Sequence, residues 1–312
     1  MIRLGLFLAG MRLAEWLPPA VLYRLARLVA LLWSYVPSAP QRQLRCNLAQ
    51  VVGLPPAAPA VRRLARQAFQ VQAANYVDLL RGRAVDQAEL EDRFVRVGDG
   101  WPAFEAALRE RRGMVLVTAH FGRVELLRQY FGRAGLAATL VVERLEPPAL
   151  FHLICRLRAQ PTIQLVPHDA ALRPCLRALA RGEAAAFFAD WDPTGHGVLV
   201  RFFGASARLP AGPAFMALRA SVPLFVGAVL PPDPADPLRR WQAFAAPPLV
   251  LEATGDLAAD LQRGTQGIAH WLEQIIGQYP EQWVMFHHIW AEDELACEAQ
   301  AVPGVASSEA RA

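Results

Sequence analysis

Short runs of Val, Leu, Phe and Ile alternate with amphipathic stretches of helical spacing from about residue 103 onward. Apolar runs of this length, bounded by turn residues, predict buried strands. We expect strands over Met114–Ala119, Ala138–Glu143, Thr162–Val166, Ala185–Asp190, Val198–Phe203 and Val222–Leu230. We expect helices over Val124–Arg133, Pro148–Ala159, Ala170–Arg181, Ala214–Ala220 and Asp256–Gly277. This alternation is typical of an α/β domain with a central mixed sheet flanked by helices.

The first 40 residues are strongly apolar, but charged residues interrupt every run before it reaches the roughly 18 residues that cross a bilayer. Pro18 and Pro19 divide the segment into two helices, and in the second Arg24 and Arg27 lie off the apolar stripe. We therefore expect residues 1–40 to form amphipathic, membrane-associated helices whose arginines reach lipid phosphates. The alternative is a pair of helices packed on the protein's own core.

Residues 41–295 predict one α/β domain, because we find no internal repeat and no low-complexity linker in them. The part before residue 100 has a mainly helical pattern, broken by a proline-rich loop at residues 55–59. Residues 296–312 predict a disordered tail.

Composition narrows the chemistry. All 32 basic residues are arginine, so mechanisms that need a Schiff-base or P-loop lysine are excluded. A net charge of +4 favours anionic partners such as phospholipid headgroups, coenzyme phosphates or an acidic carrier protein. No nucleic-acid motif or long basic tract is present, so we expect no nucleic-acid partner. The four cysteines lack metal-ligand spacing, and we expect neither a metal nor another cofactor.

The segment from Met114 to Glu125 carries the strongest chemical signal. A buried strand ends, His120 stands at the turn, Gly122 loosens the backbone, and a helix follows with Glu125 in its first turn. A carboxylate there can hold one imidazole nitrogen while the other removes a proton from a hydroxyl. The spacing H-x4-acid occurs three times in the chain, so spacing alone decides nothing. Only His120 follows a convincing strand, at the sheet edge where α/β sites lie.

Two further sets of polar residues follow predicted strands. Glu143 and Arg144 end one strand, where Arg144 can bind an acceptor phosphate or pair with Glu146. Asp190 and Asp192 follow another strand, and we interpret Asp190 first as a polar wall of the acceptor site. The pair can also form a turn. A third interpretation makes Asp190-x-Asp192 the metal site of a metal-dependent glycosyltransferase.

Several ordered segments resemble the family of late lipid A acyltransferases and phosphatidylinositol mannoside acyltransferases. These segments are His120–Glu125, Glu143-Arg-Leu, Asp190-Trp-Asp-Pro-Thr-Gly-His, Phe202-Phe-Gly, Leu209-Pro-Ala-Gly-Pro and Tyr279-Pro-Glu-Gln-Trp-Val-Met-Phe-His-His-Ile-Trp. Many relatives have Asn-Trp where this chain has Arg123-Val124, and lipid A enzymes usually close with Arg-Trp where it has Ile289-Trp290.

The resemblance implies an enzyme that moves a fatty acyl chain from acyl-CoA or acyl carrier protein to a hydroxyl of a membrane glycolipid. It implies that His120 and Glu125 are the catalytic pair and that an apolar tunnel receives the acyl chain. The implied location is the cytoplasmic face of the inner membrane, peripheral or monotopic. The departures leave the acceptor open between a lipid A precursor and a phosphatidylinositol mannoside.

Three other residues have structural interpretations. We expect Arg156 and Arg158 at the protein surface, and we expect the Trp283 side chain to pack in the core.

Overall fold

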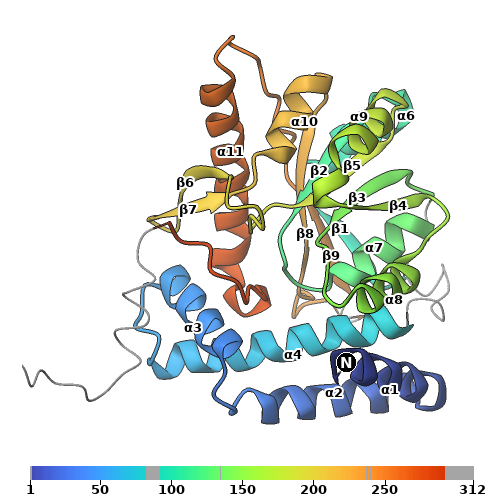
Figure 1. Ribbon diagram of the computed structural model, residues 1–312, viewed down its shortest axis with the longest axis vertical. Helices are drawn as coiled ribbons and strands as arrows, with labels where there is room; N and C mark the ends of the chain where they lie inside the picture. Colours follow the sequence, from blue (N-terminus) through green and yellow to red (C-terminus); the bar gives the residue numbers. More distant parts are fainter. Residues whose placement is uncertain (1, 82–91, 134, 237, 239, 292–312) are drawn as a thin grey trace, which may run out of the picture.

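A seven-stranded mixed sheet between two layers of helices forms the centre of the computed structural model (Figure 1). The structure describes residues 2–81, 92–133, 135–236, 238 and 240–291. The order across the sheet is β1-β9-β8-β2-β5-β3-β4. The strands are β1 (Phe94–Val97), β2 (Met114–Thr118), β3 (Ala138–Val142), β4 (Ile163–Pro167), β5 (Ala184–Phe188), β8 (Leu224–Leu230) and β9 (Trp241–Ala245).

Five neighbouring strands, β8, β2, β5, β3 and β4, run parallel, whereas β9 pairs antiparallel with β8 and leads to β1 at the edge. Strands covered on both faces need apolar side chains in both directions, which explains their continuous Val, Ala and Phe runs. The carboxyl ends of the parallel strands therefore meet at one edge of the sheet. In that register Thr118 of β2 lies opposite Phe188 of β5.

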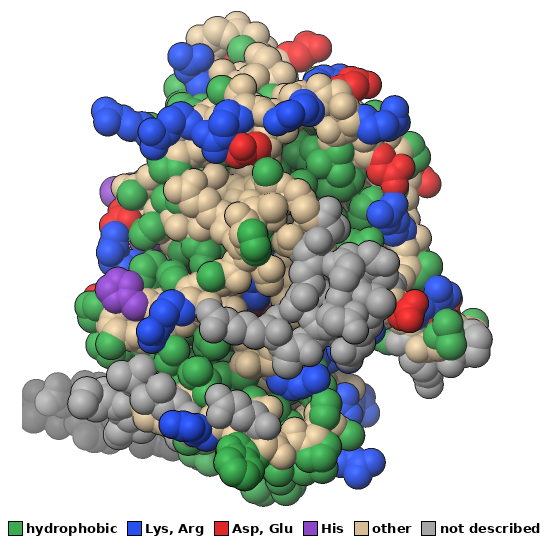
Figure 2. Space-filling view, turned by 90° about the vertical axis from the view of Figure 1, so that its right-hand side faces the viewer, with side chains coloured by type: hydrophobic (Ala, Val, Ile, Leu, Met, Phe, Trp, Pro, Cys, Tyr) green, Lys and Arg blue, Asp and Glu red, His purple; other side chains and the backbone are tan. Residues whose placement is uncertain are grey.

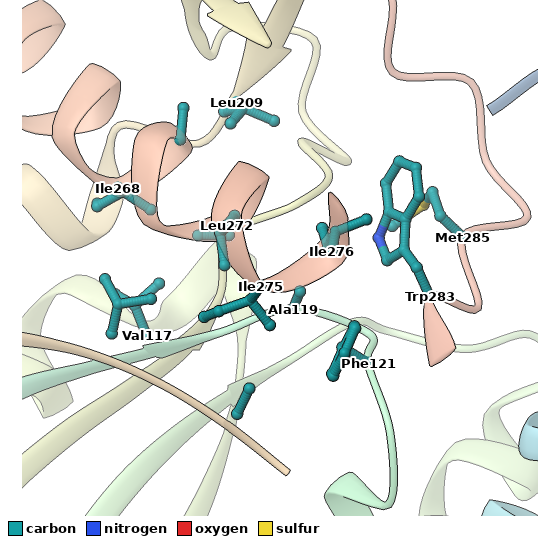
Figure 3. Close-up of a cluster of buried hydrophobic side chains, with 14 of the residues drawn as sticks. Val117, Ala119, Phe121, Leu209, Ile268, Leu272, Ile275, Ile276, Trp283 and Met285 are labelled. Atoms are coloured by element: carbon teal, nitrogen blue, oxygen red, sulfur yellow. The ribbon is translucent and has the colours of Figure 1, made fainter. Parts of the chain in front are cut away.

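Helices cover both faces of this sheet. One face carries α6 (Trp101–Glu110) and α7 (Val124–Arg133), and the other carries α9 (Leu172–Ala180), α10 (Gly212–Ala220) and α11 (Leu257–Gln278). The apolar stripe of α11, formed by Ile268, Leu272, Ile275 and Ile276, faces Val117 of β2 and Ala119 just after it (Figure 3). The 11-residue helix α8 (Pro148–Arg158) connects β3 to β4.

A hairpin outside the main sheet, β6 (Val198–Phe202) and β7 (Ala205–Leu209), packs beside α11 (Figure 1). Its two-residue turn, Phe203-Gly204, has φ values of 47° and 75°, as a type I′ turn requires. Gln266 of α11 ties the hairpin down, since its side chain donates to the Arg201 carbonyl and accepts from the Arg201 N–H, both at 2.9 Å.

Four helices precede the sheet: α1 (Ile2–Trp16), α2 (Pro19–Trp33), α3 (Ala39–Val52) and α4 (Pro59–Arg81). The long α4 runs beneath the sheet, and α1 and α2 lie below it (Figure 1). Phe7 and Met11 of α1 pack against a buried cluster that α4 and α8 share. None of the described helices is both long and apolar enough to cross a membrane.

The predicted α/β class with a mixed sheet is confirmed, and every strand and helix expected after residue 103 is present. One expectation was wrong: Phe94–Val97 forms β1 inside the stretch read as helical. This four-residue strand is too short for a period to show. Strands β7 and β9 and helix α6 were not predicted. The tail expected at 296–312 lies outside the described residues, and the boundary at residue 40 remains a prediction.

Candidate active site

His120 stands in a tightly held turn after β2. The Val284 N–H donates to the His120 carbonyl at 2.8 Å, and the Gly122 N–H donates to the Gln282 carbonyl at 2.9 Å. Gly122 has a φ of 62°, and a Cβ added there would lie 2.0 Å from the Val229 carbonyl oxygen. Only glycine fits this position, so the turn that presents His120 is fixed by backbone contacts from β8 and the closing segment.

The partner of the imidazole is Asp190. Its Oδ1 lies 2.9 Å from His120 Nδ1, and its Oδ2 accepts the His120 backbone N–H at 2.8 Å. The Trp283 indole N–H donates to the same Oδ2 at 2.9 Å. Asp190 is fully buried, so three donors replace the water that its carboxylate would otherwise bind. The sheet register explains the pair, because His120 and Asp190 each follow the matched residues Thr118 and Phe188 by two positions.

This pairing sets the proton affinity of both groups. Burial works to lower the pKa of His120, but the charge and hydrogen bond of Asp190 outweigh it, and the pKa is raised. Burial works to raise the pKa of Asp190, but His120 and Trp283 outweigh it, and that pKa is lowered. The His120 side chain is 39% exposed and stacks on Phe188 at 4.5 Å. With Nδ1 bound to Asp190, Nε2 is the nitrogen left to meet a substrate proton.

Glu125 does not occupy the place that the sequence predicted for it. We expected its carboxylate to orient His120, yet it is buried between two arginines. Oε2 accepts from Arg128 Nε at 3.0 Å, and Oε1 accepts from Arg158 Nε at 2.8 Å and from Arg158 Nη2. The reason is that Glu125 lies within the first turn of α7 and faces Arg128 one turn on. Burial alone would raise the pKa of Glu125, but the two guanidinium groups lower it.

An apolar cavity of about 140 Å³ lies beside this site, between the sheet and helices α6 and α7. Its walls are formed largely by aromatic and aliphatic side chains, including Trp101, Phe104, Phe131, Leu140, Phe225 and Phe244. Glu125, Arg128 and Arg158 contribute its charged groups. Phe188 both lines the cavity and stacks on His120, so this ring connects the cavity wall to the imidazole.

Glu143 and Arg144 follow β3 at the same sheet edge. Arg144 is 51% exposed and pairs with Asp169 at 3.1 Å, so its partner is an acid just after β4 and not Glu146, which was one of its possible partners. Its guanidinium also lies over the Phe151 ring, 5.9 Å from the centroid. Glu143 is exposed, and its charge acts to raise the pKa of His120. Both residues therefore lie on the open side of the site.

Asp190 and Asp192 use their oxygens in separate places. Asp192 Oδ1 accepts from the Thr194 N–H at 3.0 Å and from the Thr194 hydroxyl at 2.7 Å, and its Oδ2 accepts from the Gly197 N–H at 2.5 Å. Asp192 thus forms a turn, the second of its three interpretations. Between the two acids, Trp191 stacks on His287 at 3.8 Å with an interplanar angle of 11°.

The bacterial lipid A biosynthesis acyltransferase family matches residues 2–292 of this chain. The chain belongs to this family. The phosphatidylinositol mannoside acyltransferase of Mycobacterium tuberculosis strain H37Rv is 29% identical over 255 residues, which cover 80% of this chain and 77% of the relative. The enzyme of the same name from Mycolicibacterium smegmatis is 29% identical over 262 residues, 80% of each chain. The predicted family and the predicted enzyme class, an acyltransferase, are confirmed.

Sequence reasoning missed two features of the acyltransferase site. Arg158, expected at the surface, faces the cavity and is held by Glu125. Trp283, expected in packing, is buried as expected but also donates to Asp190. A signal for the Asp190 contact was present, since β2 and β5 are each followed by Ala and then a polar residue, as Ala119-His120 and Ala189-Asp190.

Proposed function

We propose that this acyltransferase moves a fatty acyl group from a thioester to a hydroxyl of a membrane glycolipid, with His120 as the general base. The observation that carries the proposal is the imidazole paired with buried Asp190 and stacked on Phe188, a residue that also lines an apolar cavity. A histidine held by a carboxylate next to an apolar cavity fits a reaction between a hydroxyl and a fatty thioester. The relatives named above favour a phosphatidylinositol mannoside acceptor over a lipid A precursor.

The reaction runs through Nε2 of His120. Nε2 takes the proton of the acceptor hydroxyl as its oxygen attacks the thioester carbonyl, and Asp190 stabilises the imidazolium that forms. The attack forms the new C–O bond and a tetrahedral oxyanion, and the C–S bond breaks as this intermediate collapses. The thiolate leaves with the proton that His120 returns. The balance needs no further reactant.

Arg158 supplies a positive charge for the attack on the thioester carbonyl. Its guanidinium lines the cavity, is 28% exposed, and lies close enough to act on the pKa of His120. Such a donor stabilises negative charge as it develops on the carbonyl oxygen. Glu125 fixes the Arg158 fork through two hydrogen bonds, so we assign Glu125 a positioning role in place of the expected contact with the imidazole.

The acceptor approaches from the open side of His120. The stacked rings of Trp191 and His287 offer a flat surface for a sugar ring, and the charges of Glu143, His120 and Asp190 all act on the pKa of His287. Glu143 can therefore accept hydrogen bonds from sugar hydroxyls beside the base. Arg144 lies on the same edge and can exchange Asp169 for an acceptor phosphate.

The N-terminal helices provide a surface for lipid. Side chains more than a third exposed include Leu13, Trp16, Val21, Leu25, Leu28, Val29, Leu32, Trp33, Tyr35 and Val36. Residues 16–77 contain seven arginines and no acidic residue, although the whole chain is only +4. Hydrophobic and arginine side chains lie together at the foot of the molecule (Figure 2). We infer peripheral or monotopic binding to an anionic lipid surface, at the cytoplasmic face where acyl-CoA or acyl carrier protein is available.

The test compares His120→Ala with a control, His270→Ala, which removes an exposed histidine of α11. Each variant is given acyl-CoA or acyl carrier protein and vesicles that contain phosphatidylinositol mannoside, and mass spectrometry measures the acylated product. His120→Ala should make no product while its melting temperature stays that of the wild type, and His270→Ala should match the wild type. Full turnover by His120→Ala would refute the proposal. Consumption of a sugar nucleotide with a divalent ion would favour the glycosyltransferase alternative, which the separate contacts of Asp190 and Asp192 do not support.

A further inference from the structure

The turn that presents His120 carries a buried arginine that the reaction does not use. Arg123 lies three residues after His120, and its side chain is 9% exposed. Its Nε donates to Asp78 Oδ2 at 2.5 Å, and its Nη2 donates to Asp78 Oδ1 and to the Tyr23 hydroxyl, the latter at 3.1 Å. The Tyr23 hydroxyl in turn donates to Asp78 Oδ1 at 2.5 Å. A closed network thus joins α2, α4 and the His120 turn.

Further contacts of Arg123 and of the His120 turn hold this network in place. The Arg123 guanidinium lies between two rings, 5.1 Å from the centroid of Tyr23 and 5.3 Å from that of Trp241. Asn75 of α4 donates to the Gly122 carbonyl at 2.8 Å. The turn is therefore attached to α4 through its backbone as well as through Arg123. Asp78, the acid at the centre, has a fully buried side chain.

A buried ion pair of this kind fixes positions strongly, because separating its partners leaves a charge without water or a counter-ion. Tyr23 belongs to α2, and most of the large exposed apolar side chains near it, from Val21 to Trp33, belong to the same helix. Asp78 is the first acidic residue after Glu15 in the sequence, so residues 16–78 offer Arg123 a single carboxylate. The path from the apolar face of α2 to His120 thus runs through Tyr23, Asp78 and Arg123.

We propose that Arg123 is a positioning residue that couples the seating of α2 on a lipid surface to the orientation of His120. The proposal rests on the proposed function, because it assigns the lipid surface to α2 and the base to His120. When α2 binds the surface, its place against α4 is fixed, and Tyr23 holds Asp78 and Arg123 in the arrangement described here.

The test uses Tyr23→Phe, which removes one hydroxyl and keeps the ring, with Tyr76→Phe as the matched control, because Tyr76 is an exposed tyrosine of the neighbouring α4. The substrates are a short acyl-CoA and a water-soluble alkyl mannoside, so neither needs a membrane. Rates are measured with and without vesicles of phosphatidylglycerol and phosphatidylethanolamine that contain no acceptor. Vesicle binding is measured separately by sedimentation.

We expect vesicles to raise the rate of the wild type and of Tyr76→Phe. Tyr23→Phe should bind vesicles equally well yet show the same rate with and without them. Arg123→Lys keeps the charge but loses the fork, and its kcat should fall about a hundredfold, as for a reacting group misplaced by about 1 Å, with little change in the KM for acyl-CoA. A purely structural role would lower the melting temperature without changing the response to vesicles.

Activation of Tyr23→Phe equal to that of the wild type would overturn the coupling. So would loss of its vesicle binding, since Tyr23 would then serve only the seating of α2, and so would a wild type that vesicles do not activate. A wild type that acylates no mannoside under any condition would instead refute the proposed function. The two failures are therefore distinguishable.

Discussion

Replacing Asp190 with asparagine tests the catalytic pair most sharply. Oδ2 of Asp190 accepts two N–H groups, from the His120 backbone and from Trp283, while Oδ1 faces His120 Nδ1. In Asp190→Asn the single carbonyl oxygen must serve the two N–H donors, which turns the amide NH2 toward Nδ1. An NH2 group donates, so it selects the imidazole tautomer that carries its proton on Nε2. That nitrogen then has no lone pair for the substrate hydroxyl.

The expected loss is large. Substituting the orienting aspartate of a Ser-His-Asp triad with asparagine lowers kcat about 10⁴-fold through the same tautomer change. At about 1.36 kcal/mol per tenfold, this corresponds to roughly 5.4 kcal/mol of transition-state stabilisation. The pH dependence gives a second signature. Because Asp190 raises the pKa of His120, the base works only above that raised pKa, and removing the charge should move the acid limb of kcat/KM to lower pH.

The assay follows acyl transfer from acyl-CoA between pH 5 and 9 for the wild type, Asp190→Asn and Asp192→Asn. The last is the matched control, since the hydrogen bonds of Asp192 to described residues lie within its own turn. Asp192→Asn should leave the position of the acid limb unchanged. A loss of less than tenfold in Asp190→Asn, with its acid limb unmoved, would show that Asp190 neither orients His120 nor sets its pKa.

Three further predictions concern the walls of the site. Glu125→Gln leaves two arginines without their buried carboxylate and should lower the free energy of unfolding by about 3–5 kcal/mol in urea titrations. Because the pKa of Glu125 is lowered, the difference in stability between the wild type and Glu125→Gln should shrink as the pH falls through that pKa, and a difference that does not change with pH would contradict this role of Glu125. Gly122→Ala meets the Val229 carbonyl, whereas Gly204→Ala has the same backbone strain in open space, so only the first should destroy activity, as transfer assays and thermal melts of both will show. Ala186→Phe fills part of the cavity, so a series of acyl-CoA donors should show a shift to shorter chains, each excluded methylene forfeiting about 0.8 kcal/mol; an unchanged optimum would place the acyl chain elsewhere.

The sequence predicted the parts of the fold that depend on local pattern. Strand β2 appears where it was predicted, because a strand buried on both faces leaves a continuous apolar run in the sequence. Helix α7 appears where it was predicted, because its apolar residues follow helical spacing. Strand β1 could not be predicted, because its four residues are stabilised by pairing with β9, about 150 positions away. Pairing between distant segments leaves no period in either of them.

The candidate site divides in the same way. His120 was predicted because it follows a strand within one segment, whereas the carboxylate on its Nδ1 comes from the end of another strand. A motif of six positions, from His120 to Glu125, draws attention to Glu125, and only the sheet register shows that Asp190 is adjacent to His120. Arg158 was missed for a related reason: it ends α8, and only the packing of α8 against α7 brings it to Glu125.

Building one base from two neighbouring strand ends has a consequence for how such enzymes diversify. The chain between β2 and β5 adds β3 and β4 to the sheet, and the connection between these two strands carries Glu143, Arg144 and α8. Insertions or deletions in this connection can reshape the approach to the imidazole while the ladder between Met114–Thr118 and Ala184–Phe188 holds His120 and Asp190 in place. New acceptors can therefore be acquired in the loops without rebuilding the chemistry.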